Sequence, residues 1–230
     1  MSYRALVLFD IDGTLMRRAG PHHRQALVHG IRKVTGLDTS TIGIPVQGML
    51  DPAIVAEMMR RAGARRALIR QAMPEIQRAA ERYYLRVCPP LEGSHCPGVP
   101  ALLERLVRRG FLLALVTGNL TRIGWRKLER AGFAHYFRYG AFGDMAATRS
   151  RLVKWAIREA IGQHALPARA PVTLVGDATS DVIAARENRV RVIAVQTGIT
   201  PVEDLQALKP DYLLRNLRDF RLRMVEDPPR

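Results

Sequence analysis

The chain is poor in cysteine and has no long apolar run, and each absence excludes a class of protein. Its 230 residues include two cysteines, Cys88 and Cys96, which are too few for a structural zinc site with four ligands. No apolar run approaches the roughly 18 residues that cross a bilayer. The first residues lead into a short apolar run closed by acids, unlike a signal peptide. We therefore expect free thiols, no membrane association and a cytoplasmic location.

Acidic residues are also few, with 21 against 36 basic ones, which gives a net charge of +15 and a pI near 11. Such a charge is typical of proteins that bind nucleic acid. However, only four of the basic residues are lysines, and the arginines are scattered as short pairs such as Arg60–Arg61. We find no run of five basic residues and no aromatic residues interleaved with them. Nucleic acid is therefore not expected as a partner, despite the net charge.

Short apolar runs separated by helix-like segments indicate the fold class. The runs rich in β-branched residues and leucine span residues 5–9, 111–116, 172–175 and 190–195. Continuous apolar runs of this kind are typical of strands buried on both faces, so they predict an α/β fold with a mainly parallel sheet and helices on both faces. Further short strands are expected at 139–142 and 211–214.

The stretch between the first two runs, residues 16–96, is helical in pattern. Apolar residues recur at helical spacing until Gly36, which ends a first helix. Asp51 precedes a proline and is expected to cap a second helix. A third pattern over 68–87 contains Pro74, which predicts either two helices or one kinked helix.

The position of this helical stretch suggests a lid. Ligands of open α/β sheets bind at the carboxyl ends of the strands, and the stretch follows the first strand directly. We therefore divide the chain into a core domain of residues 1–15 and 97–230 and a helical cap domain of residues 16–96.

Polar residues follow three of the apolar runs. Asp10 and Asp12 close the first run and point to the same side, because side chains alternate along a strand. The run ending at 116 is followed by residues 117–119, Thr-Gly-Asn, whose hydroxyl and backbone N–H groups suit an anion. The run ending at 175 leads to Asp177 and Asp181. Any one of these groups alone could be an ordinary helix cap, but three strand ends meeting at one crevice indicate a binding site.

The carboxylates at this crevice need a counter-charge. Two unpaired carboxylates about 4 Å apart repel by about 4 kcal/mol at an effective dielectric near 20, and a phosphate would add to that repulsion. A divalent cation with oxygen ligands removes the conflict, and Mg²⁺ commonly bridges a carboxylate and a phosphoryl oxygen. The sequence therefore predicts Mg²⁺ as the cofactor.

These motifs, in this order and spacing, resemble those of the haloacid dehalogenase superfamily over residues 3–217. The resemblance rests on the Asp-x-Asp-Gly-Thr signature that begins at Asp10, the Thr-Gly-Asn strand end and the Gly-Asp-x-x-x-Asp turn of residues 176–181. It implies a Rossmann-like core with a helical cap. It also implies that Asp10 attacks phosphorus to form an aspartyl-phosphate, while Asp12 protonates the leaving oxygen and then activates water.

The resemblance also implies the binding residues. Phosphate would be bound by Thr117, Gly118 and Asn119, and the metal ion by Asp10, Asp12, Asp177 and Asp181. Similar proteins carry a cap loop that meets the substrate where this chain has residues 47–51, although a turn before the helix explains that segment equally well.

A basic residue is expected before the last motif, where similar proteins use lysine or arginine to hold the charges of nucleophile and phosphate. Arg149 is our choice for this catalytic and substrate-binding role, and Arg151 and Lys154 are its rivals. Lys154 fits equally the solvent face of an amphipathic helix.

Asp12, the second acid of the signature, restricts the types of reaction that the site could catalyse. A halide leaving group needs no proton, so Asp12 favours phosphoryl chemistry over carbon–halogen cleavage. We expect a Mg²⁺-dependent phosphatase that resembles phosphoglycolate phosphatases and takes a small phosphorylated metabolite. A phosphosugar mutase would share the same residues. The alternative from another class is a non-catalytic protein that binds anions or nucleic acid. The sequence does not indicate an oligomeric state.

Overall fold

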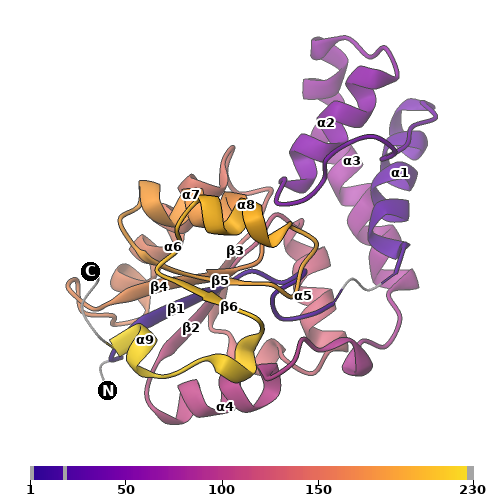
Figure 1. Ribbon diagram of the computed structural model, residues 1–230. Helices are drawn as coiled ribbons and strands as arrows, with labels where there is room; N and C mark the ends of the chain where they lie inside the picture. The colour runs from indigo at the N-terminus through magenta and orange to yellow at the C-terminus, as the bar shows by residue number, and fades with distance from the viewer. Residues whose placement is uncertain (1–2, 18–19, 227–230) are drawn as a thin grey trace.

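The computed structural model describes residues 3–17 and 20–226, and its centre is a parallel sheet of six strands (Figure 1). The strand order is β3-β2-β1-β4-β5-β6, and every neighbouring pair is parallel. The strands are β1 (Leu6–Phe9), β2 (Leu112–Val116), β3 (Tyr139–Ala141), β4 (Val172–Gly176), β5 (Arg191–Val195) and β6 (Tyr212–Leu214). The structure confirms the predicted Rossmann-like α/β fold, and β1 lies at its centre.

The alternation of side chains along the strands divides the core into two layers. Leu6 and Leu8 of β1 belong to one apolar cluster, and Val7 and Phe9 belong to the other. Because both faces are covered, the strands are mainly apolar, as the sequence predicted, with Thr173 of β4 and Arg191 of β5 as buried polar exceptions. One face carries α4 (Val99–Arg108) and α5 (Thr121–Arg130); the opposite face carries α6 (Arg149–Gln163), α7 (Thr179–Glu187) and α8 (Val202–Ala207). A short helix, α9 (Arg223–Glu226), follows β6.

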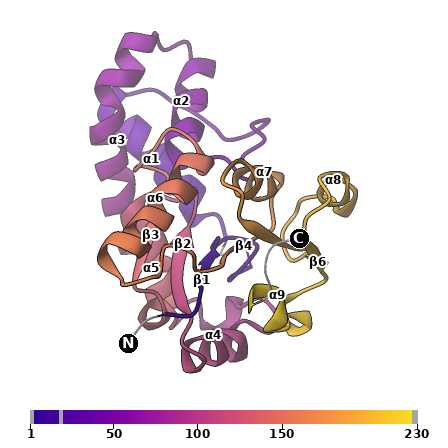
Figure 2. The ribbon, with the colours of Figure 1, turned by 90° about the vertical axis from the view of Figure 1, so that its left-hand side faces the viewer.

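Three helices of the insertion stand apart from the sheet, at the opposite end from α4 and α9 in both views (Figures 1 and 2). They are α1 (His22–Thr35), α2 (Asp51–Arg61) and α3 (Arg66–Val87). α1 and α3 approach closely at Gly30, where a Cβ atom would lie 2.7 Å from the carbonyl oxygen of Ile76. Pro74 lies inside α3, which continues past it as one helix rather than two.

The two connections between the insertion and the sheet lie side by side. The amide of Cys96 donates to the Leu15 carbonyl over 3.0 Å, and the amide of Arg17 donates to the Ser94 carbonyl over 2.7 Å. A chain that leaves and re-enters the core at one point can carry a compact unit between the two crossings. This pairing supports our proposal of a cap domain of residues 16–96 on a core of residues 1–15 and 97–230.

Two smaller expectations concern the cysteines and the membrane. Cys88 and Cys96 are free thiols, and both are buried. Among the helices of residues 3–17 and 20–226, none is long and apolar enough to cross a membrane.

Candidate active site

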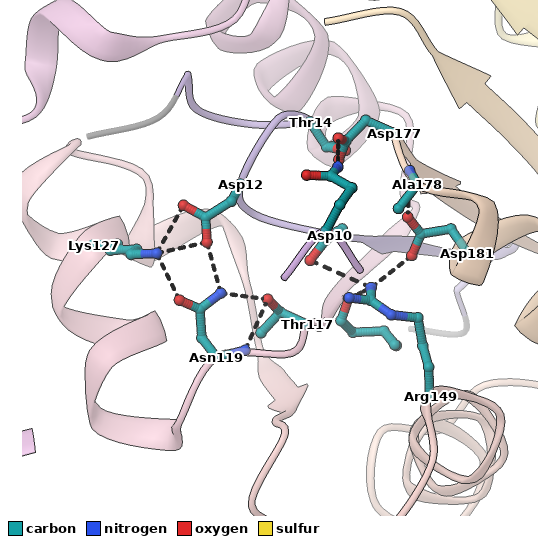
Figure 3. Close-up of polar contacts among 12 residues, drawn as sticks. Asp10, Asp12, Thr14, Thr117, Asn119, Lys127, Arg149, Asp177, Ala178 and Asp181 are labelled. Carbon is teal, nitrogen blue, oxygen red and sulfur yellow. Dashed lines mark hydrogen bonds and ion pairs between the residues drawn. The ribbon is translucent and has the colours of Figure 1, made fainter. Parts of the chain in front are cut away.

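The carboxyl ends of three adjacent strands bring the predicted site residues together. Asp10 follows β1, Thr117 follows β2 and Asp177 follows β4, and β1 lies between the other two strands (Figure 3). A cavity of about 360 Å³ opens above these strand ends. Its walls come from the core and from the insertion, which contributes His23 and Gln47. The crevice expected from the sequence is therefore present, and the inserted helices form part of it.

Three buried carboxylates form a cluster, and two of them, Asp10 and Asp177, line this cavity. Asp10, Asp177 and Asp181 each offer an oxygen atom, and these three atoms lie within 4.8 Å of one another. Burial, together with the charges of Asp10 and Asp181, raises the pKa of Asp177 to about 8. Burial also raises the pKa of Asp181. A compact set of carboxylate oxygens that disfavours its own ionisation fits a hard divalent cation.

This cluster predicts how stability depends on pH when no divalent cation is bound. The Asp177 pKa is raised from its ordinary value of 3.8 to about 8, so the folded protein binds a proton that the unfolded chain releases. The stability that comes from this proton is complete below pH 3.8 and is lost as the pH rises through about 8. In chelator, we expect the free energy of unfolding from urea titrations to fall between pH 5 and pH 8.

Two comparisons identify the source of this slope. Asp177→Asn should flatten it, and Mg²⁺ should stabilise the wild type more at pH 8 than at pH 5, because the cation competes with the proton. Equal stability of the chelated wild type at both pH values would contradict the carboxylate cluster.

Arg149 supplies the positive charge that is present in this cluster. Thr148 caps α6, accepting from the Arg151 amide over 3.3 Å, and Arg149 is the first residue of the helix. Its Nη1 lies 2.6 Å from Asp181 Oδ1 and 3.5 Å from Asp10 Oδ1. Burial alone would lower the pKa of Arg149, but the charges of Asp181 and Asp10 raise it. The rivals Arg151 and Lys154 are exposed on the same helix.

Asp181 has two roles in this arrangement. One carboxylate oxygen binds Arg149, and the other accepts from the amide of Ala178 over 3.0 Å, at the start of α7. The helix-cap interpretation of Asp181 and its membership of the carboxylate cluster are therefore both compatible with the structure.

Residues 117–119 form the wall of the cavity beside Asp10. The Asn119 side-chain amide donates to Thr117 Oγ1 over 2.7 Å, which leaves the Thr117 hydroxyl hydrogen available to a ligand. The Gly118 carbonyl accepts from the amide of Asp51 over 2.8 Å. A Cβ atom at Gly118 would overlap the carbonyl of Met49, so a glycine is needed where the insertion meets this strand end.

Asp51 does not cap its own helix as the sequence predicted. Leu50 is the N-cap of α2, and Asp51 is the first helical residue. The Asp51 carboxylate instead accepts from the amide of Leu120, just before α5, over 2.8 Å. It also binds His23 Nε2 over 2.8 Å. The sequence pattern of an acid before proline indicates a helix start but cannot show that the acid serves a different helix.

Asp12 lies apart from the three clustered carboxylates. Its side chain turns toward α5, where Lys127 Nζ lies 2.6 and 2.7 Å from its two oxygens (Figure 3). Burial would raise the pKa of Asp12, but the charges of Lys127 and His23 and hydrogen bonds from Lys127 and Asn119 lower it to about 2. The assignment of Asp12 as a metal ligand stays a prediction.

Lys127 is a site residue that our sequence analysis missed. It is only 1% exposed, although lysines on helices are usually solvated. Its position offered a signal, because Ile123, Gly124 and Leu128 lie at the spacing that places Lys127 on the buried face of α5. Thr14 and Gln47 were not assigned to the carboxylate cluster either, and both donate to Asp177, over 3.1 and 2.7 Å.

Comparison with known proteins connects this geometry to a family. The sequence profile described as haloacid dehalogenase-like hydrolase matches residues 7–186. A phosphoglycolate phosphatase of Agrobacterium fabrum is 31% identical over 224 residues, which cover 91% of this chain and 87% of that protein. A 5′-nucleotidase of Pseudomonas aeruginosa is 24% identical, over 94% of this chain and 93% of its own.

Solved structures share the fold. The crystal structure of a β-phosphoglucomutase from Clostridium difficile has a TM-score of 0.74 and 14% sequence identity. The match covers 98% of this chain and 96% of that one. At this identity the likeness extends to the arrangement of core and inserted helices and not to the substrate.

Proposed function

The chain belongs to the haloacid dehalogenase-like hydrolases, and we propose that it is a Mg²⁺-dependent phosphatase that cleaves a small phosphomonoester through an aspartyl-phosphate on Asp10. The observation that carries the proposal is the position of Asp10. Its carboxylate lies beside the Arg149 guanidinium and clusters with two further carboxylates, and it lines a cavity that the insertion helps to form. Similarity to phosphatases over nearly the whole chain supports the same reaction.

The first step forms a bond between an Asp10 oxygen and phosphorus and breaks the bond from phosphorus to the leaving oxygen. Arg149 lies beside Asp10, and Thr117 lines the same cavity; both are assigned to the non-bridging phosphoryl oxygens, whose charge the guanidinium balances. Bound to Asp10, Asp177 and Asp181, a Mg²⁺ ion would neutralise charge on the carboxylates and on the phosphoryl group.

Asp12 is assigned to both proton transfers. It gives a proton to the leaving oxygen in the first step and takes one from the water that attacks the aspartyl-phosphate in the second. The low pKa of Asp12 means that the free protein carries the carboxylate. Asp12 must therefore take up a proton before the first step, and a phosphomonoester with a second pKa near 6 can supply one at mildly acidic pH.

The inserted helices are assigned to a cap that closes the cavity. Residues 47–51 support this, because Gln47 reaches Asp177 and Asp51 is bound to the Gly118 carbonyl. A closed cap excludes bulk water, which strengthens the electrostatic interactions around the phosphoryl group.

Asp12→Ala tests the acid–base assignment. With an alkyl phosphate, kcat/KM should fall by about 10²- to 10⁴-fold, because an alkoxide leaves poorly without a proton. With p-nitrophenyl phosphate, whose leaving group needs no proton, kcat/KM should fall far less. Steady-state kinetics on the two substrates measure this difference, and equal losses on both would refute the role of Asp12 as the acid.

A phosphosugar mutase would use the same residues, so the product must be identified. We expect a hexose 1-phosphate, if it is accepted, to yield inorganic phosphate and free hexose. Accumulation of hexose 6-phosphate without phosphate release would replace the phosphatase proposal with the mutase one.

A further inference from the structure

The ammonium group of Lys127 lies between the core and the insertion. Its Nζ atom is within 2.7 Å of both Asp12 oxygens, 2.6 Å from Asn119 Oδ1 and 3.1 Å from His23 Nδ1. An ammonium group has three hydrogens, so the carboxylate, the amide oxygen and the imidazole nitrogen together use all of them.

The surroundings of Lys127 hold Asp12 in one place. The Asn119 side-chain nitrogen donates to Asp12 Oδ2 over 2.8 Å and to Thr117 Oγ1 over 2.7 Å. Asp12 is thus bound by two neighbours that also bind each other, and it is joined through Asn119 to the hydroxyl assigned to phosphate. Such a closed set of hydrogen bonds restricts the orientation of a carboxylate more than a single ion pair does.

His23 connects this set to the insertion. It is the second residue of α1, and its Nε2 lies 2.8 Å from Asp51 Oδ2, on α2. When the His23 ring is neutral, Nδ1 accepts from Lys127 and the hydrogen on Nε2 is donated to Asp51. Tyr84 of α3 packs edge-on against the ring, with centroids 5.9 Å apart. The histidine that Lys127 binds is therefore carried by α1 and contacted by both α2 and α3.

We propose that Lys127 is a positioning residue for the proton transfers and fixes the orientation of the Asp12 carboxylate at the cavity wall. We propose further that, through His23, the position of Lys127 depends on how the inserted helices pack against the core. The inference rests on the proposed function, because that function assigns the proton transfers to Asp12. Lys127 does not touch the reacting atoms in this role; it acts through the carboxylate that does.

A purely structural ion pair is the competing explanation. Replacing one partner of a buried pair destabilises a protein whatever its role, so stability alone does not separate the two explanations. The dependence of the rate on the leaving group does separate the two explanations. A misplaced acid slows the cleavage of an alkyl phosphate and hardly affects an aryl phosphate, whereas general destabilisation of the site slows both.

The first experiment compares Lys127→Met with the wild type on an alkyl phosphate and on p-nitrophenyl phosphate. We expect kcat/KM for the alkyl phosphate to fall by about 10²-fold, with a several-fold loss at most for the aryl phosphate. Lys33→Met, at an exposed lysine of α1, is the matched control and should leave both values unchanged. Equal losses on the two substrates would overturn the inference.

A double-mutant cycle tests whether Lys127 acts through Asp12. In an Asp12→Asn background the further change Lys127→Met should alter kcat/KM for the alkyl phosphate by less than about threefold, since there is no acid left to position. Retention of the full effect of Lys127→Met in that background would show an independent role and would overturn the inference.

His23→Leu tests the connection to the insertion. It also provides a second test should the Lys127 variant misfold, because His23 is partly exposed and its replacement disturbs the buried core less. We expect kcat/KM to fall by about tenfold with the alkyl phosphate and hardly at all with the aryl phosphate. In the Lys127→Met background, His23→Leu should cause no further fall in kcat/KM for the alkyl phosphate. His29→Ala, on the same helix but stacked on Tyr83, is the control and should not change the ratio of the two substrates. A wild-type ratio in His23→Leu would overturn the connection.

The activity of the wild type shows whether a negative result counts against the proposed function or only against the role of Lys127. If it cleaves neither substrate nor any other phosphomonoester, the proposed function is wrong and this inference is overturned with it. If the wild type is active and Lys127→Met keeps the wild-type ratio of the two substrates, the proposed function stands and only the role of Lys127 is wrong.

Discussion

Asp10→Asn is expected to abolish phosphate release and at the same time to stabilise the metal-free protein. The amide is a poor nucleophile, so turnover should fall by at least about 10³-fold, as for other nucleophile replacements. The charge of Asp10 raises the pKa of Asp177 and of Asp181, which shows that its carboxylate repels both. Removing that charge should raise Tm in chelator.

The measurement combines a phosphate-release assay with thermal melts in chelator and in Mg²⁺. The variant should gain less from Mg²⁺ than the wild type, because one of the three clustered carboxylates loses its negative charge. Asp38→Asn, at an exposed carboxylate, should leave turnover and both melts unchanged. Wild-type turnover in Asp10→Asn would show that another residue attacks phosphorus.

Arg149→Met should have the largest destabilising effect in the site. The guanidinium is buried and binds Asp181 over 2.6 Å, so its loss leaves buried carboxylates without a counter-charge. Breaking a buried pair in this way costs about 3–5 kcal/mol. We expect a loss of that size in urea titrations of the metal-free protein, partly recovered in Mg²⁺ because the cation replaces the missing charge.

Arg149→Met should also weaken the binding of phosphate, measured as inhibition of the remaining activity by inorganic phosphate. Arg158→Met is the matched control, because Arg158 is exposed on the same helix. An Arg149 variant with wild-type activity and wild-type phosphate inhibition would transfer the proposed role to Arg151 or Lys154.

The sheet could be predicted because its central strands are buried on both faces and are therefore marked by mainly apolar runs. The carboxylate cluster could be anticipated for a related reason. Asp10 and Asp177 directly follow such runs, and the ends of adjacent parallel strands meet. Local pattern and topology together were sufficient for this half of the site.

The side-chain contacts between the core and the insertion could not be predicted in the same way. Asp12 and Lys127 are 115 residues apart, and the sequence around each of them does not indicate that the two side chains meet. Two further contacts were unpredictable for the same reason: Gln47 donates to Asp177, and the Asp51 carboxylate accepts from the Leu120 amide before α5. Each depends on how the insertion packs against the strand ends. For α3 the sequence left two alternatives, and the structure shows the single helix that continues past Pro74.

One measurement tests the central claim most directly: phosphate release from a panel of small phosphomonoesters, including phosphoglycolate, in Mg²⁺ and then in excess chelator. The account predicts release that is concentrated on one or two compounds, that stops in chelator and that returns when Mg²⁺ is restored. Absence of release from every compound in Mg²⁺, or release that chelator does not affect, would contradict it.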